Sequence, residues 1–260
     1  MTPILQTTLP EAIWMTPATA RLPGILPVQG EDWLRIDDAY AGQMAERDRL
    51  IVSQPATVHA LRPEAAPAAA ELLDKVLDRL TRLPGFSADA AQVHRPDGTR
   101  VPVDRTAPLL TLGRLVQSDF CILLPDGQGE HLLSGAILCF PASWTLAQKI
   151  GRPLTRIHVP VPDYDPAMAA RVQRLFDAIR PEQPLWRGNA LIYDDPTLHQ
   201  PRAEGEARPR PVQNLYLRSE RQCLMRLPET RAVVFAIHTT VIRLADLDPP
   251  ARAALLAARS

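Results

Sequence analysis

Two long runs near the C-terminal end of the chain restrict its fold more than any other feature. Residues 215–227 and 231–244 are rich in apolar residues, the second run also in β-branched ones, and Pro228-Glu229-Thr230 separates them. Two such runs joined by a short turn predict an antiparallel β-hairpin. The fold must therefore contain an antiparallel sheet.

The rest of the chain alternates between strand and helix patterns. A second hairpin is predicted from residues 119–124 and 131–140, and a further strand from residues 186–193. An apolar stripe at helical spacing predicts a helix over residues 64–83. Shorter helices are predicted around residues 36–44 and 146–150, after Asp165 and after Asp248. The predicted class is α+β, with an antiparallel sheet covered by helices on one side.

Composition narrows the class of protein further. The 260 residues carry 29 basic and 29 acidic side chains, which argues against a protein that holds nucleic acid by bulk charge. The 27 prolines predict short elements with many boundaries. No apolar run is long enough to span a membrane, and no signal peptide is evident, so we expect a cytoplasmic protein. We expect residues 1–105 to form a mostly helical or irregular extension packed on a domain over 106–260, as one continuous unit.

Three cysteines occur at wide spacing, without a CxxC pair. This pattern matches neither a disulfide framework nor a zinc site. Cys121 and Cys139 lie inside apolar runs, so we expect them to be small core residues.

His158 is the first candidate for chemistry. It lies in the segment Ile157-His158-Val159-Pro160-Val161-Pro162. If this segment is extended, His158 points away from the apolar side, and the prolines stiffen its backbone. An imidazole held in this way suits a metal ligand. The alternative is a histidine that bonds to a neighbouring backbone group.

A polar face on the strand around residues 216–224 is the second candidate. Arg218, Glu220 and Gln222 alternate along this strand and so share one of its faces. Either water covers that face, or the face lines a polar cavity in which Glu220 binds an amine and Arg218 a carboxylate.

Three further positions leave alternatives open. His238 lies among apolar residues and is expected to be a hydrogen-bonded core histidine, whereas His199 lies on a polar loop and is expected at the surface. Arg187 opens a predicted strand, where it either binds an anion or forms a structural salt bridge.

Several segments, taken in order, resemble one known family. They are Trp144 with Lys149-Ile150-Gly151, the segment 157–162, Arg187 with Asn189, the segment 218–228, and the segment 235–239. In order and spacing they are similar to the haem-dependent oxidative N-demethylases, over roughly residues 20–245. The chain departs from the family pattern at Ala190, where an aromatic residue is expected, and this predicts a reshaped pocket.

The resemblance implies a haem b protein on a PAS-like fold. The family activity is oxygen-dependent demethylation of a small secondary amine such as dimethylamine, which releases formaldehyde. O2 is then a substrate, and NADPH supplies electrons through separate flavin and iron–sulfur reductase subunits. The alternative function is a non-catalytic PAS-like sensor of haem, gas or a small ligand. A third reading is an interaction module without a cofactor.

The resemblance also implies roles for individual residues. His158 is expected to be the axial iron ligand, with His238 and His199 as alternatives. Arg187 and Arg218 are expected to contact the haem propionates, with Lys149 and Arg152 as further cofactor-binding residues. Glu220 is expected to be the catalytic acid that holds the cationic amine.

Overall fold

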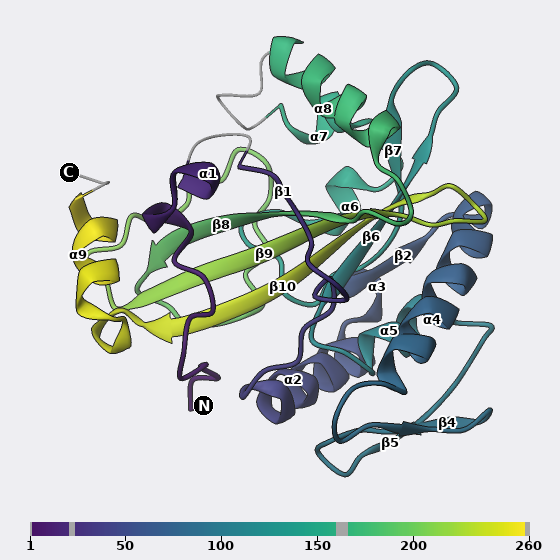
Figure 1. Ribbon diagram of the computed structural model, residues 1–260, viewed down its shortest axis with the longest axis horizontal. Helices are drawn as coiled ribbons and strands as arrows, with labels where there is room; N and C mark the ends of the chain where they lie inside the picture. The colour runs from purple at the N-terminus through teal and green to yellow at the C-terminus, as the bar shows by residue number, and fades with distance from the viewer. Residues whose placement is uncertain (1, 21–23, 160–165, 258–260) are drawn as a thin grey trace.

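A seven-stranded antiparallel sheet forms the centre of the computed structural model, which describes residues 2–20, 24–159 and 166–257. The strand order is β1-β8-β9-β10-β6-β7-β2 (Figure 1). In chain order these strands are β1 (Leu26–Pro27), β2 (His59–Leu61), β6 (Asp119–Pro125), β7 (His131–Ile137), β8 (Leu185–Tyr193), β9 (Tyr216–Arg226) and β10 (Val233–Arg243). The α+β class is confirmed, and so are both predicted hairpins.

The turn between β9 and β10 is fastened to a helix. The backbone N–H groups of Glu229 and Thr230 donate to the carboxylate of Glu71, each at 2.8 Å. Arg231 takes a left-handed conformation, with φ of 61°, which allows the chain to reverse over so few residues. This turn therefore holds the longest hairpin of the sheet against the helix that carries Glu71.

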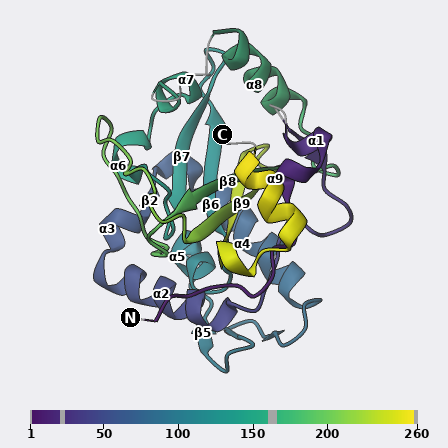
Figure 2. The same ribbon diagram turned by 90° about the vertical axis from the view of Figure 1, so that its left-hand side faces the viewer.

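Helices cover both faces of the sheet, so the prediction of a one-sided cover is wrong (Figures 1 and 2). One face packs on α2 (Tyr40–Ser53), α4 (Ala66–Leu80) and α5 (Pro108–Gly113), and the other on α6 (Leu146–Lys149), α7 (Leu154–Ile157) and α8 (Pro166–Ala178). The cause is that the central strands are apolar on both sides. Cys223 and Leu224, adjacent on β9, belong to opposite apolar clusters.

Helix starts account for some of the 27 prolines. Proline is the first residue of α1 (Pro17–Ala20), α3 (Pro55–Val58), α5, α8 and α9 (Pro249–Ala257). At that position the ring already has helical φ, and the missing N–H has no partner within the helix. The predicted N-terminal cap of α8 by Asp165 lies outside the described residues.

The first hundred residues contain more regular structure than their pattern predicts. Residues 87–102, within the extension that we expected to be mostly helical or irregular, form a three-stranded sheet of β3 (Ser87–Ala88), β4 (Gln92–His94) and β5 (Arg100–Pro102). Only Val93 and Val101 are buried apolar residues there, too few for a strand pattern. The main apolar core includes residues on both sides of the proposed boundary at 105/106, such as Leu72 and Met225; the boundary itself stays a prediction.

The N-terminal segment lies against the back of β8. A Cβ atom at Gly188 would lie 2.5 Å from Cγ2 of Ile13, so glycine is needed for this close approach. Ile13 begins the short helix η1 (Ile13–Met15), and Trp14 in that helix donates its indole N–H to the carbonyl of Ala251 in α9 at 2.8 Å. The two ends of the chain thus meet behind β8.

A fully buried ion pair joins α2 to the end of β6. Arg47 Nη1 lies 2.6 Å from Asp119 Oδ1, and both side chains are at most 1% exposed. The carboxylate of Asp119 also accepts the backbone N–H groups of Cys139, at 2.7 Å, and Phe140, at 2.8 Å. A charge buried this deeply is tolerated only when such partners surround it.

We predict that Asp119→Asn lowers the free energy of unfolding by about 3–5 kcal/mol, because the guanidinium of Arg47 stays buried without its counter-charge. Asp74→Asn is the matched control, since the Asp74–Arg105 pair is more than half exposed and should contribute little. Urea unfolding followed by circular dichroism measures both. A loss at Asp119 no larger than at Asp74 would contradict this account.

Candidate functional site

The predicted polar face of β9 is extended by β8. Opposite positions on the two strands pair Gln222 with Arg187, Glu220 with Asn189, and Arg218 with Leu191. Cross-strand partners share a face, so these side chains form one cluster. It lies on the side of the sheet that α6, α7 and α8 cover, because Leu224 on the same face of β9 packs in their apolar cluster. This cluster is the candidate site.

The cluster is buried, so the solvated-face alternative is wrong. Arg218 is 3% exposed and Glu220 is 7% exposed. The Glu220 carboxylate has a donor at each oxygen: Arg218 Nε lies 3.4 Å from Oε1, and Gln222 Nε2 lies 3.0 Å from Oε2. The carboxylate is therefore held in one orientation by its own strand.

Arg218 also forms hydrogen bonds with two loops that follow β7 and β8 in the chain. Its Nη1 donates to the carbonyl of Leu198 at 2.8 Å, and its Nη2 donates to that of Phe140 at 2.6 Å. All three guanidinium nitrogens thus have protein acceptors. Its predicted contact with a propionate stays a prediction, and a propionate would have to compete with these carbonyls.

Arg187 differs from Arg218 in lacking such partners. Its Nε is buried and has no acceptor among the described residues. Burial lowers the pKa of the Arg187 guanidinium, and only the charge of Glu220 opposes this shift. A buried cation with an unsatisfied donor suits an anionic ligand such as a carboxylate.

His158 lies at the C-terminal end of α7, not on an extended segment. Ile157 is helical, so the predicted extended run from 157 is wrong there; Pro160 and Pro162 lie outside the described residues. The four residues of α7 are too few to show a helical period. His158 Nδ1 lies 2.8 Å from the carbonyl of Leu154. Because a carbonyl only accepts, Nδ1 carries the hydrogen, and in the neutral ring Nε2 carries the lone pair.

The charges around His158 favour that neutral ring. Burial lowers the pKa of His158 most, the bond to Leu154 raises it, and the nearby positive charges of Lys149 and Arg187 lower it further. The charge of Glu220 in turn acts on Arg187, whose pKa it raises. His158, Arg187 and Glu220 are therefore electrostatic neighbours in one group.

Lys149 lies beside this group, whereas Arg152 does not join it. Lys149 Nζ donates to the carbonyl of Ile157 at 2.6 Å and lies 4.0 Å from Glu204 Oε1. Arg152 is exposed. The structure therefore brings together five of the six predicted site residues. Gln222 completes the group; its place on the shared face was evident in the sequence, but its contact with Glu220 was not.

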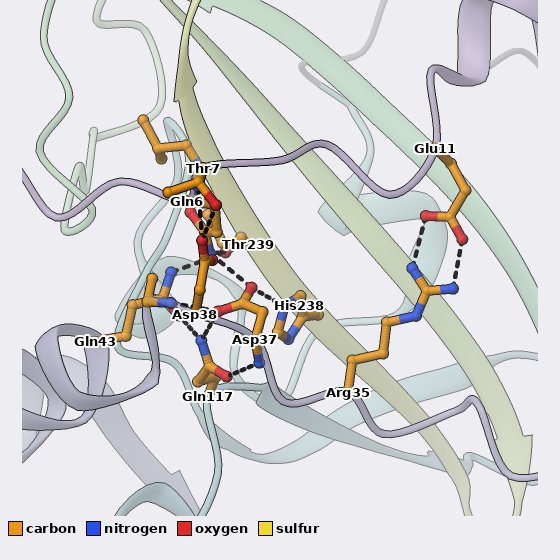
Figure 3. Close-up of polar contacts among 12 residues, drawn as sticks. Gln6, Thr7, Glu11, Arg35, Asp37, Asp38, Gln43, Gln117, His238 and Thr239 are labelled. Carbon is orange, nitrogen blue, oxygen red and sulfur yellow. Dashed lines mark hydrogen bonds and ion pairs between the residues drawn. The ribbon is translucent and has the colours of Figure 1, made fainter. Parts of the chain in front are cut away.

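The two alternative histidines lie elsewhere. His238 projects from the opposite face of the sheet, where its Nε2 lies 2.9 Å from Asp37 Oδ2 (Figure 3). Asp37 also accepts hydrogen bonds from Gln6 and Gln117, so His238 belongs to a core network, as predicted. His199 is only half-buried, and its Nδ1 lies 2.8 Å from the carbonyl of Cys139. The partnership with Asp37 leaves no local sequence signal, because 201 positions separate the two residues.

Ala190 faces away from the cluster. It packs with Leu9 and Trp14 against a third apolar group near α9. The predicted reshaping of the site pocket at this position is therefore wrong, because residue 190 lies on the other side of β8 from Asn189.

Two spaces test where a large ligand could lie. At the cluster, a gap too small to hold a water-sized sphere is lined by Ala142, Asn189, Leu191, Tyr193, Arg218 and Glu220. A cavity of about 850 Å³ lies behind β8 between the N-terminal segment and α9; its described lining contains no histidine, cysteine, lysine or arginine. Arg218 and Glu220 thus line the gap at the cluster, whereas His158 and Arg187 line neither space.

The fold and the cluster define a class of protein: an α+β domain with a histidine, two arginines and a glutamate gathered on a covered face of its sheet. The chain belongs to the family described as haem-dependent oxidative N-demethylase, alpha subunit-like, which matches residues 24–259. The predicted family is confirmed, and the match includes every predicted site residue. The family description implies dependence on haem and the presence of partner subunits.

Two observations bear on the other expectations. Within the parts of the chain that the structure describes, no helix has the length and apolar character needed to cross a bilayer. All three cysteines are buried as free thiols, as expected of Cys121 and Cys139.

We predict that substitution of the two arginines by methionine affects the free energy of unfolding of the haem-free protein differently. Arg218→Met should cost about 3 kcal/mol or more, because it leaves buried carbonyl groups and Glu220 without their donor. Arg187→Met should leave stability unchanged or raise it, because burial disfavours the charged guanidinium in the folded state. Urea unfolding compares the two variants. Equal losses would show that Arg187 has the same structural role as Arg218.

Proposed function

We propose that this chain binds haem b at the candidate site and demethylates a small secondary amine such as dimethylamine, releasing formaldehyde. O2 is the oxidant, and a partner NADPH reductase with flavin and iron–sulfur centres supplies the electrons. The observation that carries the proposal is that His158, at the end of α7, is an electrostatic neighbour of Arg187, which shares the covered face of the sheet with Glu220, in a chain of this family.

The residues fit a haem by their chemistry. His158 offers a neutral imidazole whose Nδ1–H is bonded to a backbone carbonyl, the arrangement typical of histidine ligands to metals. Arg187 offers an unsatisfied guanidinium N–H to a propionate. Haem supplies the oxygen activation that no side chain can perform. The gap at the cluster has no room for a ligand of this size, so binding must displace side chains at this face.

Glu220 is proposed to recognise the amine. Dimethylamine is a cation at neutral pH, and a buried carboxylate binds a desolvated ammonium by a charge-assisted hydrogen bond. The amide of Gln222 keeps Oε2 of Glu220 oriented, and this oxygen accepts the N–H of the ammonium group. Arg187 would meanwhile be neutralised by the propionate, which removes a like charge from beside the amine.

The cytoplasm is the proposed compartment. Three buried free thiols and an NADPH-dependent partner are both consistent with reducing surroundings.

We predict that His158→Ala abolishes the Soret band of the protein reconstituted with haemin, or shifts it strongly. His238→Ala and His199→Ala are matched controls, because each removes an alternative ligand without touching α7. Both should keep the wild-type spectrum. An unchanged spectrum for His158→Ala would remove this residue as the iron ligand, and loss of the band in a control would identify the ligand instead.

We predict that Glu220→Gln weakens the binding of dimethylamine at least tenfold and leaves haem binding nearly unchanged. Titration with the amine, followed by the shift of the Soret band, measures this effect. Glu31→Gln is the control, since Glu31 pairs with Arg82 and both side chains are nearly half exposed. Equal amine-induced shifts in wild type and Glu220→Gln would exclude Glu220 as the amine-binding residue.

Turnover separates the enzyme from the alternative of a non-catalytic sensor. With NADPH, O2, dimethylamine and a reductase, the enzyme releases formaldehyde in proportion to the NADPH consumed. A protein that binds haem and shows an amine-induced shift, yet releases no formaldehyde, would be a sensor. A protein that gains no haem absorption after incubation with haemin and removal of the excess would be neither a haem enzyme nor a haem sensor.

A further inference from the structure

Lys149 is one of only two lysines in a chain whose other basic residues are arginines. It is 9% exposed, and its Nζ donates to the carbonyl of Ile157 at 2.6 Å. Ile157 is the last residue of α7 and directly precedes His158. The ammonium group of Lys149 therefore binds the carbonyl group that is covalently joined to the backbone nitrogen of His158.

The segment that carries His158 needs such an anchor. α7 has four residues, and a single helical turn has little stability of its own. The side chain of His158 takes its direction from the bond to the carbonyl of Leu154, at the start of the same turn. Fraying of this turn would therefore separate the imidazole from its acceptor.

Other contacts hold α7 from outside. Thr155 bonds to Glu130 at 2.9 Å, and Arg156 pairs with Glu204 at 2.9 Å; both residues of α7 are exposed. Lys149 is the buried anchor among these three, and it binds the C-terminal end of the turn. Positive charge there is favourable, because the last carbonyl groups of a helix carry partial negative charge.

Two further groups near Nζ favour a positive charge at its position beside α7. Glu204 Oε1 lies 4.0 Å from Nζ, and the ring of Trp144 lies 5.9 Å from it. A carboxylate and an aromatic face both favour a cation at this place. Nζ thus has partners on several sides before any ligand binds.

We propose that Lys149 is a positioning residue that fixes the end of α7, and thereby the direction in which His158 presents Nε2 to the iron, and that it does not bind a propionate. This inference rests on the proposed function, because it assumes His158 as the ligand. It assigns Lys149 a role through the protein backbone instead of a direct contact with the cofactor.

The test compares Lys149→Met, Lys149→Arg and the exposed control Arg152→Met in the full chain. In the haem-free protein, long-range ¹H–¹⁵N NMR reports the tautomer of His158. Wild type and Arg152→Met should show the Nδ1–H form alone, and Lys149→Met a mixture of tautomers. Lys149→Arg should restore the single form, because a guanidinium can donate to the same carbonyl. An unchanged tautomer in Lys149→Met would overturn the proposal.

Haem binding gives the second readout. Loss of a group that orients a metal ligand typically weakens metal binding 10- to 100-fold, and we expect a loss of about this size for haemin in Lys149→Met. We also expect a broadened Soret band there and recovery in Lys149→Arg. Equal impairment in both variants would mean that packing, not the donated hydrogen bond, is responsible, and would overturn the proposal. A wild-type spectrum that does not depend on His158 would refute the proposed function, while the NMR result still tests the anchor.

Discussion

The buried pair of Arg47 and Asp119 connects the N-terminal half of the chain to the candidate site. Asp119 holds the backbone of Cys139 and Phe140, and the carbonyl of Phe140 accepts a hydrogen bond from Arg218. Arg218 in turn contacts Glu220. A continuous series of charged and backbone contacts thus leads from α2 to the proposed amine-binding carboxylate. Arg218, which helps to orient Glu220 along its own strand, is therefore itself held by contacts that reach α2.

The central sheet could be predicted because its signals are local. Alternation along residues 215–244 predicts the hairpin and also places Arg218, Glu220 and Gln222 on one face, which the structure confirms. The second layer of helices could not be predicted in the same way. A strand that is buried on both faces but carries a few polar residues has nearly the same sequence pattern as a strand that is buried on one face only. The pattern therefore does not show whether a second layer of helices is present, or which helix packs on which face.

The details of the site lie beyond what sequence patterns encode. Two prolines after His158 favour an extended chain, yet one turn of helix precedes them, because Leu154 is buried against α6 and β7. The bond from Lys149 to Ile157 involves a backbone carbonyl, which any residue possesses and which no pattern can mark. Likewise, the sequence does not distinguish Arg187 from Arg218. The difference is that Arg218 donates hydrogen bonds to two carbonyl groups distant in the sequence, whereas the Nε of Arg187 has no acceptor among the described residues.

Gly188 has a consequence for how the site can open. It lies between Arg187 and Asn189 on β8, and Ile13 occupies the space that any side chain at 188 would need. At this position the N-terminal segment therefore packs directly on the rear of β8, beside the cavity that separates the segment from α9. Room for the proposed haem is accordingly expected from outward movement of α6, α7 and α8, on the side of β8 away from Ile13.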